Sequence, residues 1–234
     1  MPNSPLTETM RPKRQIRSFV RREGRITPAQ RKALAELWTC YGIEDNDALL
    51  DCALLFGPGK PLTVEIGFGD GQCLRQLANA NQDMAYIGIE SHRSGAGRLL
   101  MSLQEDALTN VKVLIDDAVD ILTTRIASRS VDEFLIFFPD PWPKKRHHKR
   151  RLVNTDFLSS LARCLKPNGL IHIATDWDDY AQVIVDLIRA ESRLHNLSEQ
   201  GISPRPTSRP ETKYERRGVR LGHQVYDIIA RRCP

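Results

Sequence analysis

The sequence predicts an α/β fold in which helices cover both faces of a mostly parallel β-sheet. From Leu62 onward, apolar segments of strand length alternate with longer segments of helical periodicity. This alternation is typical of a parallel sheet, because neighbouring parallel strands need a crossover connection that is usually a helix. The first strand also runs into a glycine-rich turn, Gly67-Phe68-Gly69-Asp70-Gly71, of the kind found in nucleotide-binding α/β folds.

The length and composition indicate one large domain with an appendage and no membrane segment. The chain has 234 residues, enough to bury an extensive core, and no apolar run approaches 18 residues. Its start contains basic side chains but no apolar segment of a secretory signal. The five cysteines are odd in number and form no C-x-x-C pair, which argues against a disulfide framework and a zinc site. We therefore expect a soluble cytoplasmic protein.

The N-terminal part is expected to be an extension of the main domain. Residues 1–25 lack periodicity, which indicates a flexible basic arm. Thr27-Pro28-Ala29-Gln30 has the pattern of a capping box and predicts a helix to about Cys40. A connector with a short helix near residues 47–55 follows. The predicted division is a basic arm with a helical extension over 1–56 and the main domain over 57–234.

The alternating elements of the main domain follow in chain order. Strands are expected over Leu62 to Ile66, Ala85 to Glu90, Val111 to Ile115, Val131 to Phe138 and Leu170 to Ala174. Helices are expected over about 71–79, 94–108, 118–127, 153–165 and 177–191. Residues 200–219 predict a long loop that serves as a lid or is disordered. Val219 to Ala230 predicts a last strand, antiparallel and at or near an edge of the sheet.

The net charge of +5 conceals three basic segments on an acidic body. Residues 1–25 carry a formal charge of +5, residues 144–151 carry +6 and residues 205–220 carry +4, so the remainder carries −10. Any one of these segments is as well explained by a solvated surface. Three together favour a nucleic-acid partner, because their self-repulsion is relieved by a polyanion.

One stretch, Phe134 to Arg151, places a carboxylate beside the densest of these cation clusters. An apolar strand leads into Pro139-Asp140-Pro141-Trp142-Pro143, which can be neither strand nor helix interior because each proline lacks a backbone donor. In open α/β sheets ligands bind beyond the carboxyl ends of the strands, where Asp140 is expected. Trp142 is expected either to pack the turn or to stack on an exposed base.

The acidic residues near the glycine turn favour S-adenosylmethionine over a dinucleotide. The turn has the spacing G-x-G-x-G, and Gly67 and Gly69 permit a ligand to approach the backbone closely. Glu65 and Asp70, the two acids in or beside the turn, would repel a pyrophosphate but attract a sulfonium and an amino group. Glu90 ends the second strand, where a carboxylate accepts hydrogen bonds from ribose hydroxyls, and Asp117 follows the third, where an acid accepts from the adenine amine. Each acid taken singly is equally well explained as a strand-end or helix-cap residue.

Several motifs together resemble the bacterial tRNA (guanine-N7-)-methyltransferase family. They are EIGFGDG at 65–71, IGIE at 87–90, FPDPWPKKRH at 138–147, ATDW at 174–177, TKYE at 212–215 and the N-terminal RSFVRREGRITPAQ at 17–30. The resemblance covers nearly the whole chain. It implies a seven-stranded Rossmann-like, doubly wound sheet with an antiparallel last strand. It also implies methylation of a guanine in the tRNA variable loop by a methyltransferase domain that corresponds to residues 57–234.

The resemblance also implies roles for individual residues. The family's S-adenosylmethionine positions match Glu65, Glu90, Asp117 and Asp140, of which Asp140 is also its proposed catalytic residue. Its substrate positions match Lys144, Asp176, Thr212, Lys213, Tyr214 and Glu215, and its RNA-contacting stretch matches Arg146, His147, His148, Lys149, Arg150 and Arg151.

The reaction itself needs little acid-base chemistry. Guanine N7 has a free lone pair and no proton, so no general base is required, and most of the acceleration should come from positioning. Either Asp140 or Asp176 is expected to read the guanine edge. No metal is expected, because no third ligand accompanies His147 and His148. Two alternatives stay open, an adenine amino-methyltransferase and a non-catalytic RNA-binding protein, as do a monomer and a homodimer.

Overall fold

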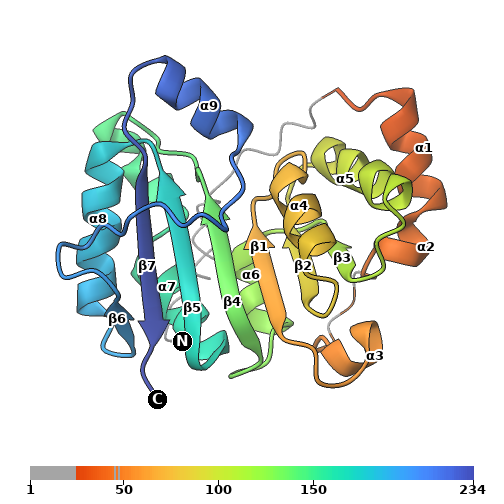
Figure 1. Ribbon diagram of the computed structural model, residues 1–234, viewed down its shortest axis with the longest axis horizontal. Coiled ribbons are helices and arrows are strands. Elements are labelled where there is room, and N and C mark those ends of the chain that lie inside the picture. Colours follow the sequence, from red (N-terminus) through yellow and green to blue (C-terminus); the bar gives the residue numbers. More distant parts are fainter. Residues whose placement is uncertain (1–24, 45, 47) are drawn as a thin grey trace, which may run out of the picture.

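The computed structural model describes residues 25–44, 46 and 48–234, so the arm expected over residues 1–25 lies almost entirely outside the described residues. Seven strands form one sheet (Figure 1). They are β1 (Leu62–Ile66), β2 (Ala85–Ile89), β3 (Val111–Leu114), β4 (Val131–Phe137), β5 (Leu165–Thr175), β6 (Leu194–Asn196) and β7 (Tyr226–Arg232). The helices are α1 (Pro28–Glu36), α2 (Trp38–Tyr41), α3 (Cys52–Phe56), α4 (Gln72–Ala80), α5 (Arg93–Glu105), α6 (Ala118–Thr124), the 3₁₀ helix η1 (Lys145–Arg150), α7 (Thr155–Cys164), α8 (Asp178–Ala190) and α9 (Lys213–Arg220).

The strand order is β3-β2-β1-β4-β5-β7-β6. Strands β1 to β5 run parallel, whereas β7 is antiparallel to both of its neighbours, β5 and β6. The predicted doubly wound sheet with an antiparallel last strand is therefore confirmed. The chain leaves β1 toward β2 on one side and later returns to place β4 on the other side. Ligands bind at such a switch point, beyond the carboxyl ends of β1 and β4.

Two apolar layers hold helices against the faces of the sheet. On one face α4 and α5 pack on β2 and β3, and α1 adds the buried Ala33 and Leu34 to the same cluster. On the other face α6, α7 and α8 pack around residues such as Phe134 and Tyr180, which are fully buried. The capping box of α1 is present, since Thr27 and Gln30 each bond to the backbone of the other. None of the described helices has the length and apolar character needed to cross a membrane.

The structure differs from the prediction in four places. The segment 200–219 is not a loop throughout, because α9 occupies its last third. The last strand consequently begins at Tyr226 rather than Val219. Strand β6, of three residues, was not predicted, since it is too short to show an alternating pattern. At the other end of the chain, the first helix breaks at Leu37, and α2 follows it.

Candidate active site

A cavity of about 440 Å³ lies at the switch point of the sheet. Its walls are the glycine turn after β1, the ends of β2, β3 and β5, the proline turn after β4, which comprises residues 138–143, and α9. Of the residues predicted to form the site, Gly67, Gly69, Glu90, Asp117, Asp140, Asp176 and Tyr214 line it. The fold therefore collects in one cavity residues that are spread over about 150 positions of the sequence.

The glycine turn has a backbone that only glycine adopts readily. Gly67, Gly69 and Gly71 all have positive φ, at 75°, 62° and 77°. The helix α5 passes so close that a Cβ on Gly95 would lie 2.0 Å from the carbonyl oxygen of Gly69. The turn is thereby fixed against α5 with its backbone exposed to the cavity.

Glu90 fixes the same turn from the end of β2. One carboxylate oxygen, Oε2, accepts a hydrogen bond from the Gly69 N–H at 2.9 Å. The other, Oε1, accepts from the His92 backbone N–H at 3.0 Å and lies 2.9 Å from His92 Nδ1. Oε1 also accepts from the Ser91 hydroxyl at 3.3 Å, so Oε2, with its single bond, is the oxygen that keeps a lone pair, and Glu90 lines the cavity although it is buried. It can therefore accept a further hydrogen bond from a ligand.

Glu65 lies behind the cavity wall rather than on it. Its side chain, near the end of β1, is buried, and Oε2 has no hydrogen-bond partner among the described residues. Burial raises the pKa of this carboxyl from 4.5 to about 8, and the neighbouring acids Glu90 and Asp70 add to the rise. A hydrogen bond from the Leu74 backbone opposes the rise, but the buried Oε2 is costly unless a ligand supplies a donor or a cation nearby.

Asp117 ends the loop after β3 and begins α6. It is the N-cap of that helix, and its carboxylate accepts a hydrogen bond from the Val119 N–H at 3.0 Å. The helix-cap interpretation considered for this residue is therefore correct, and the residue also lines the cavity. The two roles are compatible because a carboxylate accepts several hydrogen bonds at once.

The proline turn carries backbone strain beside the cavity. Phe138 and Trp142 have positive φ, 55° and 45°, which is unusual for large side chains. The Phe138 N–H donates to the carbonyl of Ala174 on β5 at 2.7 Å, and this bond fixes the start of the turn. Asp140 follows, exposed at the cavity rim, and the surrounding walls raise its pKa by desolvation, opposed by His92 and assisted by Glu90.

The basic segment 144–151 folds into η1 directly after the proline turn. The side chains of Lys144, Arg146 and Lys149 are exposed. Arg150 lies over the ring of Trp142, at 5.0 Å from its centroid, which makes packing of the turn the role the structure shows for this tryptophan. Desolvation and the surrounding cations lower the pKa of His147, as expected for a neutral member of the segment.

Arg151 differs from the other cations of the basic segment, because it is buried. Its guanidinium donates to the Pro141 carbonyl at 2.8 Å, pairs with Asp179 at 2.8 Å and lies over the ring of Tyr180. These contacts join the proline turn to α8. In this conformation Arg151 supports the turn and does not present its charge to a solvent-borne polyanion.

Helix α9 covers one side of the cavity. Thr212 is its N-cap and accepts from the Glu215 N–H at 3.1 Å. Lys213 reaches across to the glycine turn and pairs with Asp70 at 2.8 Å. Tyr214 lines the cavity near Gly69. Of the four predicted substrate residues, Lys213 and Tyr214 thus face the glycine turn, whereas Thr212 and Glu215 stabilise the start of the helix.

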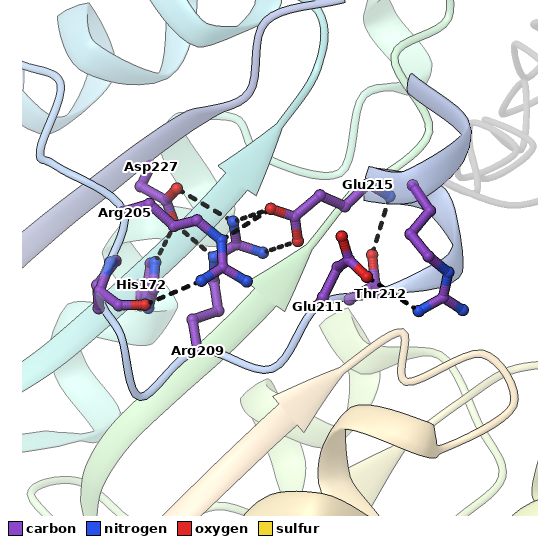
Figure 2. A network of polar contacts seen from close by, with 9 residues as sticks. His172, Arg205, Arg209, Glu211, Thr212, Glu215 and Asp227 are labelled. Atoms are coloured by element: carbon purple, nitrogen blue, oxygen red, sulfur yellow. Dashed lines mark hydrogen bonds and ion pairs between the residues drawn. The ribbon is translucent and has the colours of Figure 1, made fainter. Parts of the chain in front are cut away.

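Glu215 belongs to a buried charge network beneath α9 (Figure 2). Arg209 lies at its centre, pairing with Glu215 at 2.7 Å and with Asp227 of β7 at 2.7 Å. His172 of β5 adds a 2.7 Å contact to Asp227. Burial alone would raise the pKa of Glu215, but hydrogen bonds from Arg209 and Arg205 lower it below its usual value. The network fastens α9 to strands β7 and β5.

The chain has relatives among curated proteins. The family model that matches residues 59–228 is described as "Putative methyltransferase". Curated proteins from Alcanivorax borkumensis, Nitrosospira multiformis and Alkalilimnicola ehrlichii, each named tRNA (guanine-N(7)-)-methyltransferase, are 45%, 47% and 48% identical. The alignments cover 94–95% of this chain and 93–96% of those proteins. The chain belongs to the tRNA (guanine-N7-)-methyltransferase family.

Solved structures show the same fold outside this family. A 16S rRNA (adenine(1408)-N(1))-methyltransferase with SAM from Catenulisporales acidiphilia has a TM-score of 0.56 at 16% identity, over 78% of this chain and 90% of that one. An rRNA methylase from Streptococcus thermophilus has a TM-score of 0.51 at 10% identity, over 75% of this chain and 88% of that one. These likenesses establish a Rossmann-like methyltransferase fold.

Sequence reasoning missed several residues of the site. Arg217, Leu221 and His223 line the cavity, and Arg209 fastens α9 beneath it. The signal that was available is the T-x-x-E pattern of Thr212 and Glu215, which marks a helix start. A helix beginning there would have brought the following residues to the same wall. Among the described residues, no group of three or more His, Cys, Asp or Glu side chains is arranged to hold a metal ion.

Proposed function

We propose that this chain transfers a methyl group from S-adenosylmethionine to N7 of a guanine in the tRNA variable loop, giving N7-methylguanosine and S-adenosylhomocysteine. The observation that carries the proposal is the arrangement of Asp140. It stands at the rim of a carboxylate-lined cavity and is followed, four residues later, by an exposed basic segment. A pocket that can bind a methyl donor thereby lies next to a basic surface that can bind RNA.

The acids around the glycine turn fit the donor. The cofactor, when bound, supplies a methyl group activated by a sulfonium. Glu65 has a buried oxygen without a partner among the described residues, close to the turn, which suits an ammonium group. Glu90 keeps a lone pair on Oε2 at the end of β2 for a ribose hydroxyl. Asp117 lies on the cavity wall at the start of α6, where a carboxylate suits an adenine amine.

The chain's own residues have an electrostatic and orienting task in the transfer step. The guanine N7 lone pair forms the new bond to carbon, the carbon–sulfur bond breaks, and sulfur keeps its electron pair, so no proton moves. Positive charge passes to the purine. Asp140 and Asp176, both on the cavity wall, stabilise that charge and accept hydrogen bonds from N1–H and the 2-amino group, a donor pair that adenine lacks.

The basic segment is proposed to hold the tRNA backbone. Lys144, Arg146 and Lys149 are exposed directly beside the cavity rim, where a base leaving its stack would enter. Lysine and arginine contacts to phosphates position the substrate but read no sequence. Recognition of the guanine therefore falls to the cavity.

The test is to incubate the purified chain with labelled donor and bulk tRNA, digest the RNA and identify the methylated nucleoside. N7-methylguanosine supports the proposal. A methylated adenine amine would point to an amino-methyltransferase, and RNA binding without label transfer would point to a non-catalytic protein. Single-turnover rates of Asp140→Asn and Asp176→Asn then locate the guanine contact. Unchanged rate and base choice in both variants would exclude these carboxylates from the step.

A further inference from the structure

His223 contacts one of the two aspartates assigned to the guanine. Its Nδ1 atom lies 3.1 Å from Oδ2 of Asp176. Because an ionised carboxylate only accepts hydrogen bonds, Nδ1 carries a hydrogen and donates a hydrogen bond to Asp176. Both side chains line the cavity, and neither is fully buried. His223 lies outside every motif that links the chain to its family, the nearest of which ends at Glu215.

The end of α9 places His223 at this position. Gly222 has a φ of 82° and turns the chain after the helix, and the His223 N–H donates back to the carbonyl of Gly218 at 2.9 Å. The imidazole also meets the ring of Trp177 edge-on, with centroids 6.5 Å apart. The orientation of His223 is therefore set by three independent contacts, two from side chains and one from the backbone.

Gly218 makes a second approach of α9 to the same carboxylate. A Cβ at this position would lie 2.7 Å from Oδ2 of Asp176 and 3.3 Å from its Cγ. Because Gly218 has no side chain, α9 can pack directly against the carboxylate of Asp176. The carboxylate is enclosed on one side by Gly218 and bonded by His223, while its backbone follows the end of β5.

We infer that His223 is a positioning residue that fixes the carboxylate of Asp176 in the orientation that accepts the N1–H and 2-amino donors of guanine. The inference rests on the proposed function. A short aspartate side chain at a strand end rotates freely unless a partner holds it, and ordering it in advance lowers the cost of binding. The bond from His223 leaves Oδ1 and one lone pair of Oδ2 for the base.

Helix α9 therefore has two tasks at opposite ends. At its start, Lys213 and Tyr214 meet the glycine turn, on the donor side of the cavity. At its end, His223 meets Asp176, on the side assigned to the base. Loss of His223 should affect the base side alone, whereas a loosening of the whole helix would affect both sides.

The test compares the wild-type chain with His223→Ala, His223→Asn and the control His195→Ala, which changes an exposed histidine on β6 far along the sheet order from the cavity. Initial rates on tRNA give kcat and KM, and calorimetry gives the dissociation constant for S-adenosylmethionine. We expect His223→Ala to lower kcat/KM for tRNA about tenfold, the worth of a hydrogen bond to a charged group. The donor's dissociation constant should stay within about twofold, and His195→Ala should match the wild type.

The asparagine variant and a double-mutant cycle separate positioning from mere structural support. The side-chain N–H of His223→Asn lies close to the original Nδ1 position, so most of the rate should return. In the Asp176→Asn background, His223→Ala should cause little further loss, because its effect passes through that carboxylate.

The inference would be overturned by wild-type rates in His223→Ala, by no recovery in His223→Asn, or by losses of His223→Ala and Asp176→Asn that multiply independently. Weakening of donor binding equal to the loss on tRNA would also overturn it, since that is the signature of a loosened α9. Failure of the proposed function is distinguishable, because the wild-type chain would then form no N7-methylguanosine at all.

Discussion

Cofactor binding should depend on pH through Glu65. The pKa of this buried carboxyl is raised to about 8, so near neutral pH the free protein holds it protonated. An ammonium group bound at the glycine turn, in front of this buried carboxyl, favours the ionised form and lowers that pKa. Binding of S-adenosylmethionine then releases one proton. Its dissociation constant should fall, by at most about tenfold per pH unit, as the pH rises toward about 8, where the carboxyl of the free protein ionises and the α-amino group of the donor begins to lose its own proton.

The same group should make the unbound protein less stable as the pH rises. Between pH 4.5 and about 8 the folded state keeps a proton on Glu65 that the unfolded chain has lost. The free energy of unfolding must therefore decrease with pH in this window, by at most about 1.4 kcal/mol per unit and about 5 kcal/mol in all. Glu65→Gln removes the titrating group and should be the more stable protein above about pH 8.

Calorimetry in two buffers of different ionisation enthalpy counts the protons released on binding, and urea unfolding at several pH values gives the stability. Glu65→Gln serves as the control in both assays, with no proton release and a flatter stability profile. Two results would refute the reasoning: binding of the donor to the wild type without proton release, or a slope of affinity against pH that persists in Glu65→Gln.

Three further substitutions test separate parts of the structure. Gly218→Ala should displace the carboxylate of Asp176 by several tenths of an ångström and thereby lower kcat/KM about tenfold or more, as rate assays would show. Its Tm in thermal melts should stay unchanged or rise, because alanine favours the helix. Arg146→Ala should weaken binding of all tRNAs alike and reduce the slope of log K against log salt by about 1. Arg151 is buried, so Arg151→Ala should instead lower the free energy of unfolding by about 2 to 3 kcal/mol and leave the salt slope unchanged. Arg209→Met should cost about 3 kcal/mol in urea unfolding, because it removes the buried guanidinium that the carboxylates of Glu215 and Asp227 share. Equal salt slopes for the two arginine variants, or wild-type stability of the methionine variant, would contradict these accounts.

The parts of the fold that were predictable have local causes. Strand β1 has the bounds that were expected, because its five buried residues end at a glycine turn that no strand can continue through. The start of α1 was equally predictable, since its capping box consists of four consecutive residues. Acids at strand ends were predicted to meet in one place because parallel strands share an edge.

The parts that were not predictable depend on contacts between distant residues. Arg209 lies in a segment without periodicity, and only the fold brings it to Asp227 and Glu215. Arg151 has the same charge as its neighbours in the basic segment, and nothing local distinguishes it as the one that is buried against Tyr180. For the same reason the sequence offered no signal that His223 would meet Asp176.

The position of β7 within the sheet has a consequence for the synthesis of the protein. Strand β7 lies between β5 and β6, so until residue 232 has left the ribosome one edge of β5 stays unpaired and β6 has no strand to join. Asp227, which neutralises Arg209 beneath α9, emerges at the same stage. Most of the sheet can therefore assemble during translation, but the wall of the cavity that α9 forms becomes secure only after the last strand is released.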